Sequence, residues 1–148
     1  MPDTQEIKLL IERLESASGP DRVLDGDLVL ALGGPPDDAM PFQSEVAWTY
    51  RGGGEWFTPS PRSIGLDIVW RCPAYTGSLD SALSLVERKL PGRDIVLEIK
   101  ELMTDGVVRR ITDATIGAPY YSDEKATSGY GSNPPLALLI ALLKALQP

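Results

Sequence analysis

The chain has 148 residues, of which 43% are hydrophobic and 24% are charged, and its formal net charge is −7. This length and composition fit one compact domain over residues 1–148 and exclude a chain that is disordered throughout. Histidine is absent and Cys72 is the single cysteine, so the usual proton shuttle and the usual transition-metal ligands are missing. The composition therefore favours binding without a cofactor over catalysis.

The charge and the apolar pattern also limit the partners and the location. A net charge of −7 with only 14 Lys and Arg residues opposes binding to a phosphate backbone, so we expect no nucleic-acid partner. The longest apolar run, Leu136 to Leu143, is shorter than the roughly 20 residues that span a bilayer, and the acidic start MPDTQEIKLL does not resemble a signal peptide. With one thiol and no membrane segment, we expect a cytoplasmic protein.

Two helices are predicted in the first part of the chain. Apolar residues at helical spacing predict the first over residues 4–17, which a Gly-Pro pair ends. Asp21 is a typical N-cap for a second helix that ends before the Gly-Gly-Pro-Pro run at residues 33–36. Residues 27–32 also fit a buried strand, but we favour the helix.

The middle of the chain has the pattern of a hairpin. Residues 45–50 and 55–58 contain β-forming residues on either side of three consecutive glycines, and residues 64–70 could add an extended segment. Trp48, Trp56 and Trp70 lie in or beside this hairpin, where they either pack in the core or line a pocket.

The rest of the chain predicts a helix over residues 79–90, two paired strands around the turn Thr104-Asp105-Gly106, and a final helix from Pro134. Residues 117–133 lack periodicity and predict a long loop. The element order α-α-β-β-(β)-α-β-β-α predicts an α+β fold, with an antiparallel sheet and helices packed on one or both of its faces.

Several segments resemble small proteins of phages and of alphaproteobacterial prophages with the phage ABA-sandwich type of domain. The matching segments are Leu10-Ile-Glu-Arg-Leu-Glu, Gly19-Pro-Asp-Arg-Val-Leu-Asp25, Pro73-Ala-Tyr-Thr-Gly-Ser-Leu-Asp-Ser-Ala-Leu83 and Pro135-Leu-Ala-Leu138. The resemblance implies a three-layer α/β sandwich and a phage or prophage origin. It implies no biochemical activity, and it does not extend over residues 37–72.

Two groups of residues are candidates for a ligand site. One group lies at the start of the helix over residues 79–90 and the other in the late loop; together they are Tyr75, Thr76, Ser78, Asp80, Tyr120, Tyr121, Tyr130 and Ser132. The simpler interpretation of the first group is that Ser or Thr caps the helix and that Tyr75 packs on the sheet.

The final helix is apolar on nearly every face, so it is buried either in its own domain or against another subunit. For the second case Leu138, Leu142 and Leu146 are the candidate interface of a homodimer. The leading hypothesis is a non-enzymatic phage or prophage accessory protein that binds a protein partner or a small ligand. A narrower version of this hypothesis is a protein that antagonises host defence. The alternatives are a small hydrolase using carboxylate, Lys or Tyr chemistry, with Asp80, Lys125 and Tyr75 as first candidates, and an assembly subunit.

Overall fold

The computed structural model describes residues 3–34, 49–52, 55–59, 67–118 and 125–147. The helices are α1 (Thr4–Ser16), α2 (Arg22–Ala31), α3 (Leu79–Lys89) and α4 (Pro134–Leu146), and the strands are β1 (Thr49–Gly52), β2 (Glu55–Pro59), β3 (Asp67–Arg71), β4 (Ile95–Thr104), β5 (Val107–Ile116) and β6 (Thr127–Gly131). The strands form two antiparallel sheets, ordered β1-β2-β3 and β4-β5-β6. The predicted α+β class is confirmed.

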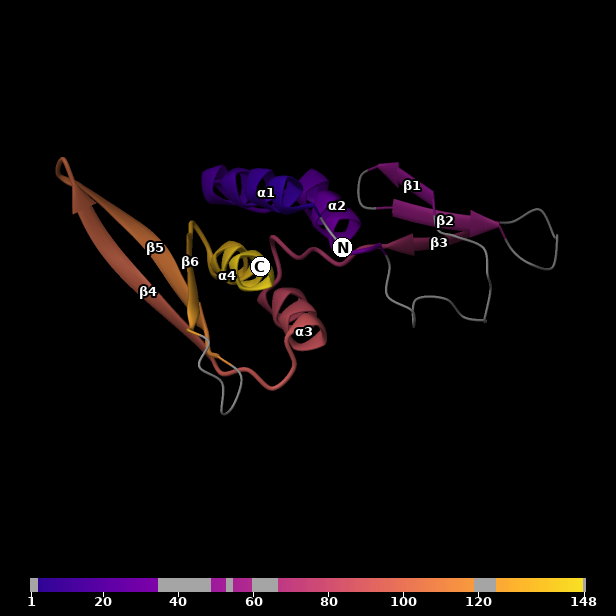
Figure 1. Ribbon diagram of the computed structural model, residues 1–148. Coiled ribbons are helices and arrows are strands. Elements are labelled where there is room, and N and C mark those ends of the chain that lie inside the picture. Colours follow the sequence, from indigo (N-terminus) through magenta and orange to yellow (C-terminus); the bar gives the residue numbers. More distant parts are fainter. Residues whose placement is uncertain (1–2, 35–48, 53–54, 60–66, 119–124, 148) are drawn as a thin grey trace.

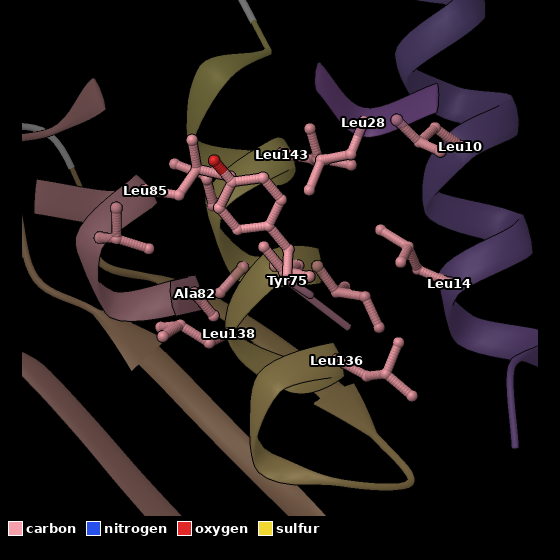
Figure 2. Close-up of a cluster of buried hydrophobic side chains, with 14 of the residues drawn as sticks. Leu10, Leu14, Leu28, Tyr75, Ala82, Leu85, Leu136, Leu138 and Leu143 are labelled. Carbon is pink, nitrogen blue, oxygen red and sulfur yellow. The ribbon is translucent and has the colours of Figure 1, made fainter. Parts of the chain in front are cut away.

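Helix α4 is the centre of the molecule. It packs on β5 and β6 on one side and on α1 and α3 on the others, so that sheet, α4 and outer helices form three successive layers (Figure 1). Every residue from Pro135 to Leu143 is buried. Leucines of α1, α2 and α3 surround it, and Tyr75 lies among them (Figure 2). The apolar character of α4 on all faces follows from this central position.

The helix ends follow their capping residues. The Asp21 side chain accepts hydrogen bonds from the backbone N–H groups of Val23 and Leu24 at 2.9 and 3.3 Å, which confirms the predicted cap of α2. Ser78 caps α3, and Asn133 caps α4 by accepting from Leu136 N at 2.8 Å, with proline in the first turn. The strand alternative for residues 27–32 is wrong over most of that range, because α2 extends to Ala31.

The prediction of a loop over the whole of residues 117–133 is wrong, because residues 127–131 form β6. A Cβ on Gly129 would lie 2.6 Å from Ala137 O and Ala141 N, and a Cβ on Gly131 would lie 2.6 Å from Ala137 N. The two glycines therefore let the strand approach the backbone of α4 closely. Thr127 and Tyr130 are the only β-forming residues of this short strand, and its two glycines lower its β-propensity, which concealed it in the sequence.

The β1–β3 sheet is built around aromatic side chains. Tyr50 pairs with Trp56, and Trp56 pairs with Trp70 on the next strand. The ring centroids are 4.4 Å apart for Tyr50 and Trp56, and 5.5 Å apart for Trp56 and Trp70. Trp56 is only 2% exposed, so it packs in the core. Trp48 lies outside the described residues.

Strands β4 and β5 form a hairpin of ten residue pairs, from Ile95 with Ile116 to Thr104 with Val107. The predicted hairpin turn is present, with Asp105 and Gly106 as its two central residues at positive φ angles of 51° and 77° and with Thr104 as the last residue of β4. Strand β6 pairs only with residues 112–116 of β5. The half of the hairpin nearest the turn therefore extends past β6 and α4 (Figure 1).

Candidate functional site

The first predicted ligand group, around Tyr75, has a structural role in this fold. Tyr75 is 3% exposed and lies among the leucines that surround α4 rather than on a sheet (Figure 2). Ser78 caps α3 by accepting from Ser81 N at 3.3 Å, and Asp80 is exposed in the first turn of that helix. The sequence-based capping interpretation therefore accounts for Ser78, and Tyr75 is a core residue.

Thr76 is completely buried and belongs to a polar cluster with Asp25. Asp25 Oδ1 accepts from the Thr76 backbone N–H at 2.7 Å and from its hydroxyl at 2.8 Å. Asp25 Oδ2 lies 2.9 Å from Arg22 Nη1, and Arg22 Nη2 donates to the Cys72 carbonyl at 2.9 Å. These bonds attach α2 to the segment that precedes α3.

The same cluster reaches the start of α4. Asn133 Nδ2 donates to the Thr76 carbonyl at 3.3 Å, and Asp21 N donates to the Thr76 hydroxyl at 2.8 Å. Three segments that are far apart in the sequence thus meet at Thr76. Because Asp25 already has partners on both oxygens, the cluster stabilises the fold instead of offering an open binding site.

The two titratable side chains next to this cluster are held in their neutral forms. Burial raises the pKa of the Cys72 thiol above 9.0, although the nearby Arg22 guanidinium acts in the opposite direction. Burial also raises the pKa of the Tyr75 hydroxyl above 10.0. A buried thiol with a raised pKa is a poor nucleophile.

The late-loop candidates are not brought together with Tyr75 into one site. Tyr120 and Tyr121 lie outside the described residues. Tyr130 is 51% exposed on β6, with Lys100 Nζ 6.0 Å from the centre of its ring. Ser132 donates to the Ala17 carbonyl at 3.0 Å and so connects the start of α4 to the end of α1.

The prediction that α4 forms the interface of a homodimer is wrong for the leucines that are buried within the single chain. Leu138 and Leu142 are 0% exposed within a single chain, because α4 is the core of the molecule. They cannot contact another copy while this fold is kept. Leu146, at the end of α4, is partly exposed. Of the two cases that the sequence left open for the final helix, the structure has burial within its own domain.

The hairpin β4–β5 has the largest group of exposed apolar side chains among the described residues, and sequence reasoning missed it. These are Val96, Ile99, Leu102, Met103, Val107 and Val108, with exposed fractions from 48% for Leu102 to 76% for Met103. They lie on both faces of the strand pair. The signal in the sequence was that apolar residues occupy both odd and even positions of β4. A strand with one solvent-exposed face instead alternates apolar and polar residues.

A smaller feature is a groove of about 250 Å³ between α1 and α2. It is lined partly by Leu9 and Leu30, which are 51% and 54% exposed, and it contains an ion pair of 2.7 Å between Arg13 and Asp27. Among the described residues no group of three metal-ligating side chains is in place to bind a metal ion, and none of the described helices is long and apolar enough to cross a membrane. No family model, curated protein or solved structure matches this chain.

Proposed function

We propose that this chain is a non-enzymatic phage or prophage accessory protein of the host cytoplasm that acts by binding a protein partner. The binding element in this proposal is the hairpin β4–β5. The observation that supports it best is the group of apolar side chains exposed on both faces of that hairpin, with Met103 76% exposed. Exposed apolar groups of this kind are typical of protein interaction sites.

The polar candidates support binding over catalysis for a separate reason. Thr76, through its bonds to Asp25, and Ser78, through its cap of α3, are engaged in hydrogen bonds that stabilise the fold, and Tyr75 is buried. Catalytic groups need to reach a substrate, whereas Thr76 and Tyr75 are buried in the core. The phage origin in the proposal depends on the resemblance of the four sequence segments alone.

The test is capture of host proteins by the immobilised chain, compared with two single variants. Val108→Glu places a charge on the hairpin, and Val23→Glu places the same charge at an equally exposed valine of α2, since the two valines are 55% and 54% exposed. We expect Val108→Glu to abolish a specific capture that Val23→Glu retains. Equal capture by both variants would show that the hairpin is not the binding element.

A further inference from the structure

The long edge of β4 has no neighbouring strand among the described residues. In the order β4-β5-β6 it is the outer strand over all ten of its residues, a length of about 33 Å at about 3.3 Å per residue. Because the two-residue turn makes Thr104 and Val107 the closing pair, the backbone groups of odd-numbered residues from Ile95 to Met103 face this edge. An unpaired edge of this length is a template for another extended strand.

Among the alignments centred on Glu98, Ile99 or Lys100, the charges on β4 favour one if the added strand is a second β4 in antiparallel orientation. When a two-fold axis perpendicular to the sheet relates the two strands, opposite residues have their side chains on the same face of the sheet. The axis therefore passes beside one residue of β4, and this residue pairs with its own counterpart in the other copy. Centring on Glu98 or on Lys100 would set like charges opposite each other. Centring on Ile99 sets Glu98 of each copy opposite Lys100 of the other.

The charges of the single chain favour the same alignment. Lys100 Nζ lies 3.2 Å from Asp113 Oδ2 and 3.8 Å from Glu98 Oε2, so one ammonium serves two carboxylates. Glu98 and Asp113 also stand directly opposite each other on β4 and β5. A second lysine opposite Glu98 would offset this like-charge pair.

The base of β4 offers a place for the most exposed apolar residue of the hairpin. An open hollow of about 580 Å³ lies between α3 and β4 and is lined by Leu83, Ser84, Glu87, Arg88 and Ile95. In the alignment centred on Ile99, Met103 of the second copy is opposite Ile95. Its thioether would therefore enter this hollow and cover Ile95 and Leu83.

We propose that the edge of β4 is occupied by a second copy of this chain, antiparallel, with Ile99 of both copies at the two-fold axis and a continuous six-stranded sheet. The inference rests on the proposed function, since it names the partner of the same hairpin. Nine residues of each β4, from Ile95 to Met103, pair in this arrangement. Ile99, 68% exposed in the single chain, is covered by its own counterpart.

Cysteine cross-linking tests the alignment directly. In Ile99→Cys the two thiols meet across the axis and should form a disulfide-linked dimer under mild oxidation. Met103→Cys is the control, because Met103 is more exposed but faces Ile95 of the other copy; it should not cross-link, whereas the double variant Ile95→Cys/Met103→Cys should. The native Cys72 is 3% exposed and does not interfere. Equal cross-linking of the two single variants would overturn the proposal.

Exchange of the charged residues tests the same alignment, and a mixture of two variants controls for a loss of folding in either one. Glu98→Lys and Lys100→Glu each create two like-charge pairs at the interface, and each should weaken dimerisation about tenfold in light scattering or sedimentation. Mixing the two variants restores both opposite-charge pairs, so the mixture should dimerise as the wild type does. Failure of the mixture to recover would refute the alignment.

The two proposals fail in different ways. A wild-type chain that stays monomeric at all concentrations but captures a host protein in a Val108-dependent manner refutes the second copy and leaves the proposed function standing. A monomeric chain whose capture of host proteins does not depend on the hairpin refutes both. A dimer with the expected cross-links and without a host partner supports the second copy as the occupant of the hairpin.

Discussion

Single residues decide how the segments of this chain are joined. Thr76 is 0% exposed and its backbone and side chain bond to Asp25, Asp21 and Asn133, which belong to or cap helices α2 and α4. Two segments that are distant in the sequence, Gly19–Asp25 and Pro73–Leu83, therefore meet at this residue. A threonine here is a structural connector, a role that its position before a helix did not reveal.

Thr76→Val should lower the free energy of unfolding by about 1–3 kcal/mol, because the isosteric change leaves buried hydrogen-bonding groups of Asp25 and Asp21 without their hydroxyl partner. The control is Thr115→Val, whose hydroxyl bonds to Ser128 at an exposed site at 3.1 Å. That change should stay within about 0.5 kcal/mol. Urea unfolding measures both, and equal losses would contradict a structural role for Thr76.

The buried Cys72 and Tyr75 should make the protein less stable in alkali. Both pKa values are raised in the folded chain by burial, so the unfolded chain loses these protons first, near 9.0 and 10.0. Above about pH 9 the unfolded state binds fewer protons, and the free energy of unfolding falls as pH rises; below that value these two groups contribute no slope. Denaturant titrations from about pH 8 to about pH 11 measure this. Tyr75→Phe should flatten the slope above about pH 10, and an unchanged slope would contradict the assignment.

At the scale of elements, the contact between β6 and α4 depends on the absence of side chains. Gly129 and Gly131 face the helix backbone, and both are buried. The strand was not predicted because its Thr-Ser-Gly-Tyr-Gly sequence has no apolar alternation. Its place is set by the neighbours on its two sides, β5 and α4, and such long-range contacts have no local signal.

Gly129→Ala should destabilise the protein by about 1–3 kcal/mol or more, since the added methyl group would lie 2.6 Å from two backbone atoms of α4. Gly19→Ala is the matched control, because nothing lies within 4 Å of its Cβ position. Thermal unfolding of the two variants separates the steric effect from the general effect of removing a glycine. A Gly129→Ala protein as stable as the control would show that β6 and α4 are further apart than described.

At the scale of the whole molecule, the chain combines a central helix that is almost fully buried with a β4–β5 hairpin whose apolar side chains are exposed. Helix α4 is enclosed by β5, β6, α1 and α3, whereas the half of the β4–β5 hairpin nearest its turn extends past β6 and α4 (Figure 1). The strands are thus longer than the helix that covers them. In the proposed dimer the second copy pairs with the edge of β4, whereas Val107 and Val108 on β5 stay on the open faces of the sheet.

If the hairpin binds a second copy, the midpoint of thermal unfolding should depend on protein concentration. Only the folded chain dimerises, so each tenfold increase in concentration should raise the midpoint by about 2 °C. Calorimetry on the wild type and on Glu98→Lys tests this, and the dependence should be weaker in the variant. A midpoint independent of concentration in the wild type would argue against dimerisation of the folded state.

The sequence by itself determined the local features: the four helices with the cap of α2, the hairpin turn that contains Asp105 and Gly106, and the mixed α+β class. These depend on periodicity, capping and backbone conformation within a few residues, so a single sequence contains the signal. Only the tertiary structure decided that Thr76 and Asp25 form a buried pair, that Leu138 and Leu142 belong to the core, and that residues 127–131 form a strand. Each of these depends on residues distant in the chain, and burial is a property of the packed molecule rather than of any segment.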